Sequence, residues 1–82
     1  MTPGLVRAGR AILKWSAAEL AEHSGISRAT VVDYESGNSD KRSRGMNKAS
    51  RVALARAFVD AGIEFVGGDA PGLVIHRREL LD

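Results

Sequence analysis

Residues 20–37 read LAEHSGISRATVVDYESG, and this stretch decides the fold. It lies across two short helical segments, expected at 17–23 and 28–36, which are joined by residues 24–27. A turn of three or four residues that contains glycine lets two helices cross at about 90–120°. The small side chain of Ala21, on the inner face of the first segment, permits their close approach. The sequence therefore predicts a compact pair of crossed helices.

Capping residues bound this pair. Ser16 and Glu19 have the spacing of a capping box, in which the hydroxyl and the carboxylate each accept a hydrogen bond from an otherwise unpaired amide. Gly25 permits the left-handed turn that ends the first helix. Ser27 caps the second helix, whose remaining residues are expected to project outward. The residues that anchor this second helix in the core are expected to be Ile26 and Val31.

Two further helices are expected outside the pair. Thr2, followed by Pro3, begins a first helix that Trp15 closes. Gly9 within that helix costs about 1 kcal/mol relative to alanine, so another helix is expected to pass close by. Asn47 begins a fourth helix that Gly62 ends. Its expected apolar positions are Val52, Ala53, Leu54, Ala55, Phe58 and Val59.

The last part of the chain changes character. Residues 63–66 and 73–76 are short β-like runs on either side of a turn rich in glycine, a pattern that predicts a hairpin. A lone hairpin is marginal in water. It therefore either covers the fourth helix of a monomer or joins the same strand of a second copy, and the homodimer through 63–76 is the preferred interpretation.

Composition excludes several classes of protein. The 82 residues support one small domain, and the absence of cysteine excludes disulfides, thiolate nucleophiles and zinc sites built from cysteine. Apolar runs such as 73–75 are too short to cross a bilayer. The N-terminus lacks the order of a secretion signal, so a cytoplasmic chain is expected. His23 and His76 lie far apart and no serine has a His-Asp arrangement, so we expect neither an enzyme nor a metal, cofactor or small-molecule ligand.

Charge is distributed unevenly along the chain. Residues 1–57 hold ten basic and five acidic side chains, a local charge of +5, whereas residues 58–82 hold two basic and five acidic side chains, a local charge of −3. A basic body suits a polyanion, although a surface mixed for solubility gives the same count.

The quoted stretch resembles the Cro/cI-type (XRE family) DNA-binding domain of phage and bacterial regulators. The matching positions are Leu20-Ala21, Gly25-Ile26-Ser27, Val31, the aromatic Tyr34, Glu35 and Gly37. The resemblance covers residues 5–62. It implies a mostly α fold, a lambda-repressor-like helix-turn-helix DNA-binding domain of four to five helices at 1–62, followed by a short C-terminal β-hairpin extension at 63–82. It also implies a sequence-specific transcriptional regulator, expected to be a repressor, that reads the major groove of double-stranded DNA with helix 28–36.

The resemblance assigns roles residue by residue. The base-contacting side chains are expected to be Arg28, Ala29, Thr30, Val32 and Asp33. Arg28 is the leading candidate, because a guanidinium bonds guanine O6 and N7 together. Phosphate contacts are expected at Ser16, Ala17, Ser27, Asn38, Lys41, Arg42 and Arg44; for the three loop cations, a solvated loop is the alternative. Arg10 and Glu35 match positions that form a structural ion pair.

Two departures and one alternative function remain open. The family commonly has glutamine where this chain has Ala17, and the proline often found after Gly37 is absent. Tyr34 and Trp15 are interpreted as core residues and not as base-stacking ones. The alternative function is a protein-interaction module, such as an antitoxin-like or adaptor subunit, whose last strand adds to the sheet of a partner.

Overall fold

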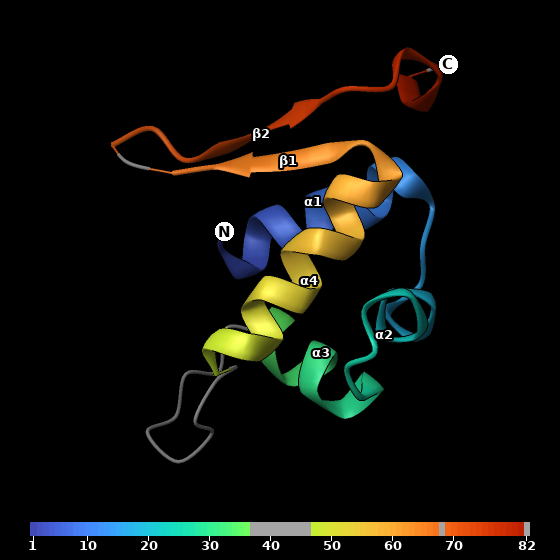
Figure 1. Cartoon of the computed structure of the whole chain (residues 1–82), viewed down its shortest axis with the longest axis vertical. Helices are drawn as coiled ribbons and strands as arrows, with labels where there is room; N and C mark the ends of the chain where they lie inside the picture. Colours follow the sequence, from blue (N-terminus) through green and yellow to red (C-terminus); the bar gives the residue numbers. More distant parts are fainter. Residues whose placement is uncertain (37–46, 68, 82) are drawn as a thin grey trace.

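The computed structural model describes residues 1–36, 47–67 and 69–81, which form helices followed by a hairpin. The elements are α1 (Pro3–Leu13), α2 (Ala17–Ser24), α3 (Arg28–Glu35), α4 (Lys48–Ala61), β1 (Ile63–Val66), β2 (Gly72–Ile75) and the short 3-10 helix η1 (Arg78–Leu81) (Figure 1). The mostly α fold with a C-terminal hairpin is the one predicted from sequence, and η1 is an addition to it. No described helix is long and apolar enough to cross a membrane.

All four predicted N-caps are present. The Thr2 hydroxyl accepts a hydrogen bond from the Leu5 amide at 3.1 Å. The side chains of Ser16, Ser27 and Asn47 each accept a hydrogen bond from the amide three residues ahead. Such bonds satisfy amides that have no partner within the helix. They explain why each helix begins where the sequence indicated.

The helix ends follow the sequence less closely. Gly25 (φ 78°) and Gly62 (φ 104°) adopt the left-handed conformation that ends α2 and α4, as predicted. By contrast, α1 ends at Leu13 and places the non-glycine residue Lys14 in that conformation, with φ 60°. Trp15, expected to close the helix, lies beyond it.

The core is built where α1, α2, α3, α4 and β1 meet. Its fully or nearly fully buried side chains are Val6, Leu20, Ala21, Val31, Leu54, Ala57, Phe58 and Ile63. Two of the six apolar positions expected on α4, Val52 and Val59, lie outside the core, since they are 53% and 55% exposed. The buried positions of α4 form one helical stripe, and that stripe includes Ala57, which the sequence reasoning omitted.

Gly9 explains how closely α1 and α4 approach. A Cβ atom at this position would lie 2.7 Å from the Phe58 ring, closer than side chains tolerate. The helix that was expected to pass Gly9 is therefore α4, and the phenyl ring of Phe58 occupies the space that a side chain would need.

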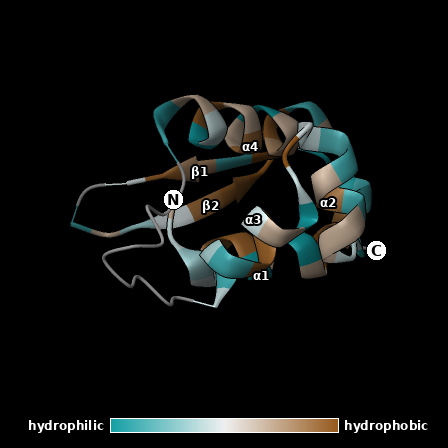
Figure 2. Cartoon of the chain, turned by 90° about the horizontal axis from the view of Figure 1, so that it is seen from below, coloured by the Kyte–Doolittle hydropathy of each residue, from teal (hydrophilic) through white to brown (hydrophobic). Residues whose placement is uncertain are grey.

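The hairpin packs across α4 and α1. Ile63 pairs with Ile75 and Val66 with Gly72 in antiparallel register. Figure 2, which looks along the longest axis of the molecule, shows β1 on the side of α4 and β2 on the side of α1. In Figure 1 the hairpin lies at one end of that axis and α3 at the other. The sheet is thus remote from the crossed helices.

Candidate nucleic-acid interface

The turn between α2 and α3 is fixed by short local hydrogen bonds. The Gly25 amide donates to the Ala21 carbonyl at 2.9 Å, and the Ile26 amide donates to the Ser24 hydroxyl at 3.3 Å. Ala21 is 8% exposed and Val31 is fully buried, so the two helices meet through small and branched apolar side chains. This packing holds α3 in one orientation relative to α2.

α3 has a buried face and an exposed face. Val31 and Glu35, one turn apart, point into the protein. The exposed side chains are Arg28, Ala29, Val32 and Asp33, four of the five predicted base-contacting residues. Positions one turn apart on a helix share a face, so these four present one continuous surface.

The fifth predicted base-contacting residue, Thr30, is engaged locally. Its side chain is half-buried, and its hydroxyl accepts a hydrogen bond from the Ser27 hydroxyl at 2.8 Å. The Ser27 oxygen in turn accepts from the Thr30 amide at 3.1 Å. Because the Thr30 hydroxyl is engaged in this way, the methyl group of Thr30 is the part of the side chain that can make an apolar contact.

The starts of α2 and α3 differ in which backbone amides remain free to donate a hydrogen bond to an anion. At α2 the Ser16 amide donates to the Glu19 carboxylate at 2.8 Å, and this hydrogen bond lowers the pKa of Glu19. In the described part of the chain the Ala17 amide has no acceptor. At α3 the amides of Arg28 and Ala29 likewise have none among the described residues. Such amides can donate to phosphate oxygens.

The remaining predicted phosphate contacts, Asn38, Lys41, Arg42 and Arg44, lie outside the described residues. On α3 itself the charged side chains of the exposed face are Arg28 and Asp33. Within the described ranges no ion pair joins these two side chains, so the Arg28 guanidinium has no carboxylate partner there.

The far end of α3 is tied to α1 by two arginines. Arg10 forms a bidentate pair with Glu35 (Nε to Oε2 2.7 Å, Nη2 to Oε1 2.8 Å) and donates to the Trp15 carbonyl at 2.9 Å. The hydrogen bond to the Glu35 carboxylate raises the pKa of Arg10. Arg7, which the sequence reasoning did not consider for this role, donates to the Glu35 carbonyl. Its position one turn before Arg10 is the signal that could have identified it.

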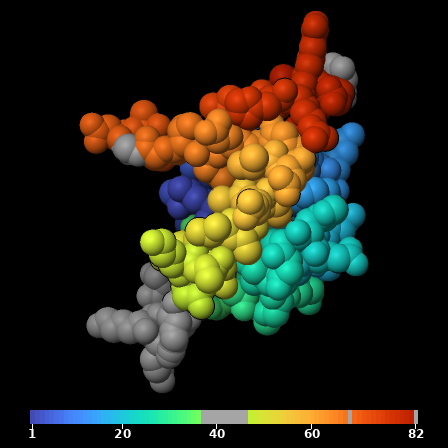
Figure 3. All heavy atoms as spheres, viewed as in Figure 1, coloured from blue at the N-terminus to red at the C-terminus, as the bar shows by residue number. Residues whose placement is uncertain are grey.

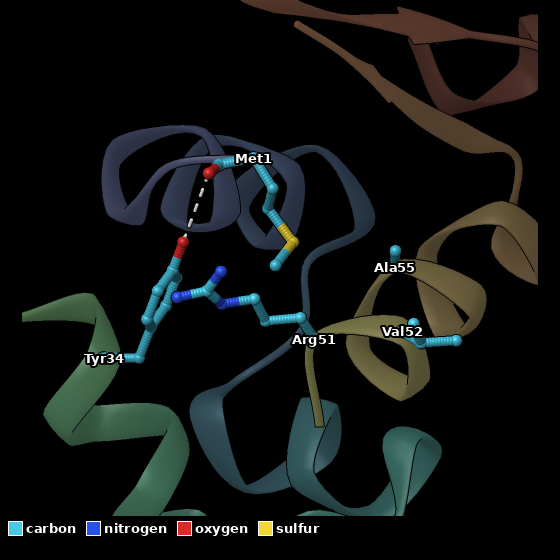
Figure 4. Close-up of a pocket in the computed structure, with 5 residues that line it drawn as sticks. All are labelled: Met1, Tyr34, Arg51, Val52 and Ala55. Carbon is cyan, nitrogen blue, oxygen red and sulfur yellow. Dashed lines mark hydrogen bonds between the residues drawn. The ribbon is translucent and has the colours of Figure 1, made fainter. Parts of the chain in front are cut away.

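Tyr34 points into the body of the protein. Its hydroxyl donates to the Met1 carbonyl at 3.3 Å, and burial raises its pKa. Figure 4 shows the Arg51 guanidinium beside this ring. The hollow between these groups has a volume of about 400 Å³ and is lined by Met1, Tyr34, Arg51, Val52 and Ala55. The geometry is that of a packing residue, as expected for Tyr34.

Trp15 connects α2 with the core. Its ring stacks on His23, with centroids 4.1 Å apart and planes 8° from parallel, and it lies 6.0 Å from the Phe58 ring. His23 sits at the end of α2 and is exposed on its other side. This contact accounts for His23 without a metal, and no described cluster of three acidic or histidine side chains could hold one.

Comparison with known proteins agrees with this geometry. Residues 6–43 match the helix-turn-helix family model, a range that begins in α1 and contains all of α2 and α3. A search of curated proteins found no match. The matched family consists of DNA-binding regulatory domains and is not an enzyme family.

Proposed function

We propose that the chain is a sequence-specific regulator that inserts α3 into the major groove, because residues 6–43 match the helix-turn-helix family model and the sequence resembles the Cro/cI-type (XRE family) domain, a class that binds DNA in transcription regulation. The DNA-binding domain comprises residues 1–62 and carries residues 63–82 as an extension. The observation that carries the proposal is the exposed face of α3, which is held outward by the buried Val31 and Glu35. A major groove about 12 Å wide admits such a helix.

Arg28 is the main base-reading residue of the proposal. It is exposed in the first turn of α3 and has no carboxylate partner among the described residues, so both edges of its guanidinium can donate to a guanine. Asp33, further along the same surface, suits a cytosine amine as an acceptor. The side chains suited to a thymine methyl group are those of Ala29, Thr30 and Val32.

Phosphate contacts supply the remaining affinity in this proposal. The amides at the start of α3 and the Ala17 amide of α2 are placed at helix N-termini, where an anion is favoured. Ser16 and Ser27 cap those two helices, and residues 38–44 add the basic side chains named above. A regulator that occupies its operator in this way blocks access to the DNA, so repression is the proposed outcome.

The test compares two arginine substitutions on one selected operator. Operator sequences are first selected from random DNA with the parent chain. Arg28→Ala is then expected to weaken binding to the selected operator by about 1–3 kcal/mol, which is roughly 5- to 150-fold, while affinity for unrelated DNA changes much less. Arg78→Ala is the control, because Arg78 is exposed on η1, at the opposite end of the molecule from α3 (Figure 1).

Two results would contradict the proposal. An Arg28→Ala variant that discriminates its operator as well as the parent removes Arg28 from base reading. If the parent chain shifts the gel mobility of no DNA at low or moderate salt, the result favours the alternative function, a protein-interaction module. The feature that favours this alternative is the hairpin, because a two-stranded sheet has edges that can accept a further strand. A reporter gene under the selected operator tests repression.

A further inference from the structure

The hollow beside Tyr34, with a volume of about 400 Å³, lies between the last turn of α3 and the first two turns of α4. Arg51, Val52 and Ala55 line it from one side of α4, Tyr34 lines it from α3, and Met1 lines it from the segment before α1 (Figure 4). The principal neighbours of α3 are α1 and α2, and those of α4 are α2 and β1, so neither helix fills this space. Ligand pockets have volumes of about 300–1,000 Å³, so the hollow has the size of a site for a small molecule.

Arg51 gives the hollow a positive charge. Its side chain is exposed, and its guanidinium has no ion-pair or hydrogen-bond partner in the ranges 1–36, 47–67 and 69–81. Figure 4 shows this side chain extending from α4 toward the Tyr34 ring. Burial raises the pKa of Tyr34 and the charge of Arg51 partly opposes that rise, so the field of the guanidinium reaches the phenol. A guanidinium in this position can donate two parallel hydrogen bonds to a carboxylate.

The rest of the lining suits an aromatic group. Met1 and Tyr34 are half-buried, and the Tyr34 hydroxyl already donates to the Met1 carbonyl, so these two residues present mainly a thioether and a ring face to the hollow. Sulfur and aromatic side chains make favourable contacts with an aromatic ring. Val52 is an apolar side chain that is 53% exposed, and an occupant of the hollow would cover it.

We propose that this hollow binds a small aromatic monocarboxylate, whose carboxylate lies on the Arg51 guanidinium and whose ring lies against Met1, Tyr34 and Val52. Arg51 is the one cationic side chain among the five lining residues, so it matches one negative charge. A second carboxylate on the ligand would lie against apolar side chains without a partner, which costs free energy. The inference rests on the hollow and does not depend on the proposed DNA binding.

The position of the hollow leaves the exposed face of α3 free. Tyr34 and the exposed Val32 are two residues apart, which at 3.6 residues per turn places them on opposite sides of the helix. Figure 3 shows the N-terminal segment, in dark blue, at the surface beside α4 and below the hairpin. The Met1 side of the hollow can therefore be reached from solvent, and a ligand can enter without displacing α3.

The test is a titration of the full chain with phenylacetate, followed by NMR, to which a mass of 8.7 kDa is well suited. The methyl signals of Met1 and Ala55 and the ring signals of Tyr34 are expected to shift along one saturating curve. Phenylacetamide has the same ring and no charge. It is expected to bind about 10-fold more weakly, because it loses the charge on the hydrogen bonds to Arg51.

Two variants separate the charge from the apolar surface. Arg51→Gln is expected to raise the dissociation constant of phenylacetate about 10-fold. Arg56→Gln is the matched control, because Arg56 is exposed on the same helix and does not line the hollow. Ala55→Leu keeps the cation and fills the hollow, so it is expected to abolish the shifts of the Tyr34 ring. Circular dichroism of each variant confirms that the helices are retained.

Three results would overturn the proposal. The first is the absence of any saturating shift at Met1, Tyr34 and Ala55 up to the solubility limit of phenylacetate. The second is an equal loss of affinity in Arg51→Gln and Arg56→Gln, which would show attraction to the basic helix and not to the hollow. The third is displacement of phenylacetate by an equal concentration of inorganic phosphate, which would show an anion site in which the aromatic ring takes no part.

Discussion

Removing Arg10 is expected to destabilise the fold more than removing the carboxylate to which it is bound. Arg10→Met leaves the Glu35 side chain, 8% exposed, without its bidentate partner and leaves the Trp15 carbonyl without its donor. Loss of one partner of a buried pair costs about 3–5 kcal/mol. Because the Arg10 side chain is 22% exposed, water screens part of the interaction, and we expect a loss near the lower end, about 3 kcal/mol.

Glu35→Gln is expected to cost less, about 1–2 kcal/mol. Glutamine keeps an oxygen that can accept one hydrogen bond from Arg10, and the guanidinium retains its bond to the Trp15 carbonyl. The cation left behind is also the more exposed of the two charges, so water can solvate it. The asymmetry between the two substitutions is therefore a direct consequence of the geometry.

The assay is urea unfolding of each variant, followed by circular dichroism. A domain of 82 residues has a free energy of unfolding of about 4–12 kcal/mol, so a loss of 3 kcal/mol is a large fraction. The corresponding fall in the melting temperature is about 12–24 °C. A double variant, Arg10→Met with Glu35→Leu, is expected to be more stable than Arg10→Met alone, because it leaves no buried charge. The reasoning would be refuted if either the double variant or the Glu35→Gln variant were less stable than the Arg10→Met variant.

Two further predictions concern α1 and α2. Gly9→Ala is expected to destabilise the chain by about 1–3 kcal/mol despite the better helix propensity of alanine, because the new methyl group meets the Phe58 ring. The matched control Gly4→Ala has room for a methyl group and is expected to be neutral or stabilising. Urea unfolding of both variants measures the difference. The Ser16 amide lowers the pKa of Glu19 below its ordinary 4.5, so the carboxylate contributes stability above pH 4.5 that is lost as pH falls through the lowered pKa. Glu19→Gln should lack this acid-dependent part of the melting temperature, and an unchanged pH profile would count against the capping box.

Features set by neighbouring residues could be predicted from the sequence. Each N-cap joins a side chain to an amide three residues ahead, so the geometry of Ser16, Ser27 and Asn47 follows from local spacing alone. The exposed face of α3 could also be predicted from the sequence, because the burial of Val31 and Glu35, one turn apart, turns the positions between them toward solvent.

Features that depend on packing between distant segments could not be predicted. α4 contains apolar residues on several sides, and the contact between Phe58 and Gly9 decides which side is buried. Val52 and Val59 were expected among the apolar positions of α4, and a one-dimensional pattern does not reveal which of those positions are buried. The end of α1 is a similar case, since nothing in the local sequence distinguishes Lys14 as the residue that takes a positive φ.

The candidate interface shows how one motif can limit another. Ser16 and Glu19 were read as a capping box, and Ser16 was also assigned a phosphate contact. In the structure the Glu19 carboxylate already accepts a hydrogen bond from the Ser16 amide. This amide is therefore not free to donate to a phosphate, and the carboxylate repels an anion at this site. The start of α3 has no acidic residue in its first turn. Of the two helix starts, that of α3 is therefore the better phosphate site.

The arrangement separates the residues that position α3 from those that would read DNA. Arg7 and Arg10 reach from α1 to the carbonyl and carboxylate of Glu35, at one end of α3, whereas Arg28 lies at the other end. A substitution at Arg10 should therefore change the free energy of unfolding and, well below the melting temperature, leave the preference for the operator intact. A substitution at Arg28 should do the reverse. If both substitutions lowered stability and preference together, the two ends of α3 would not be independent, and the assignment of Arg28 to base reading would lose its structural basis.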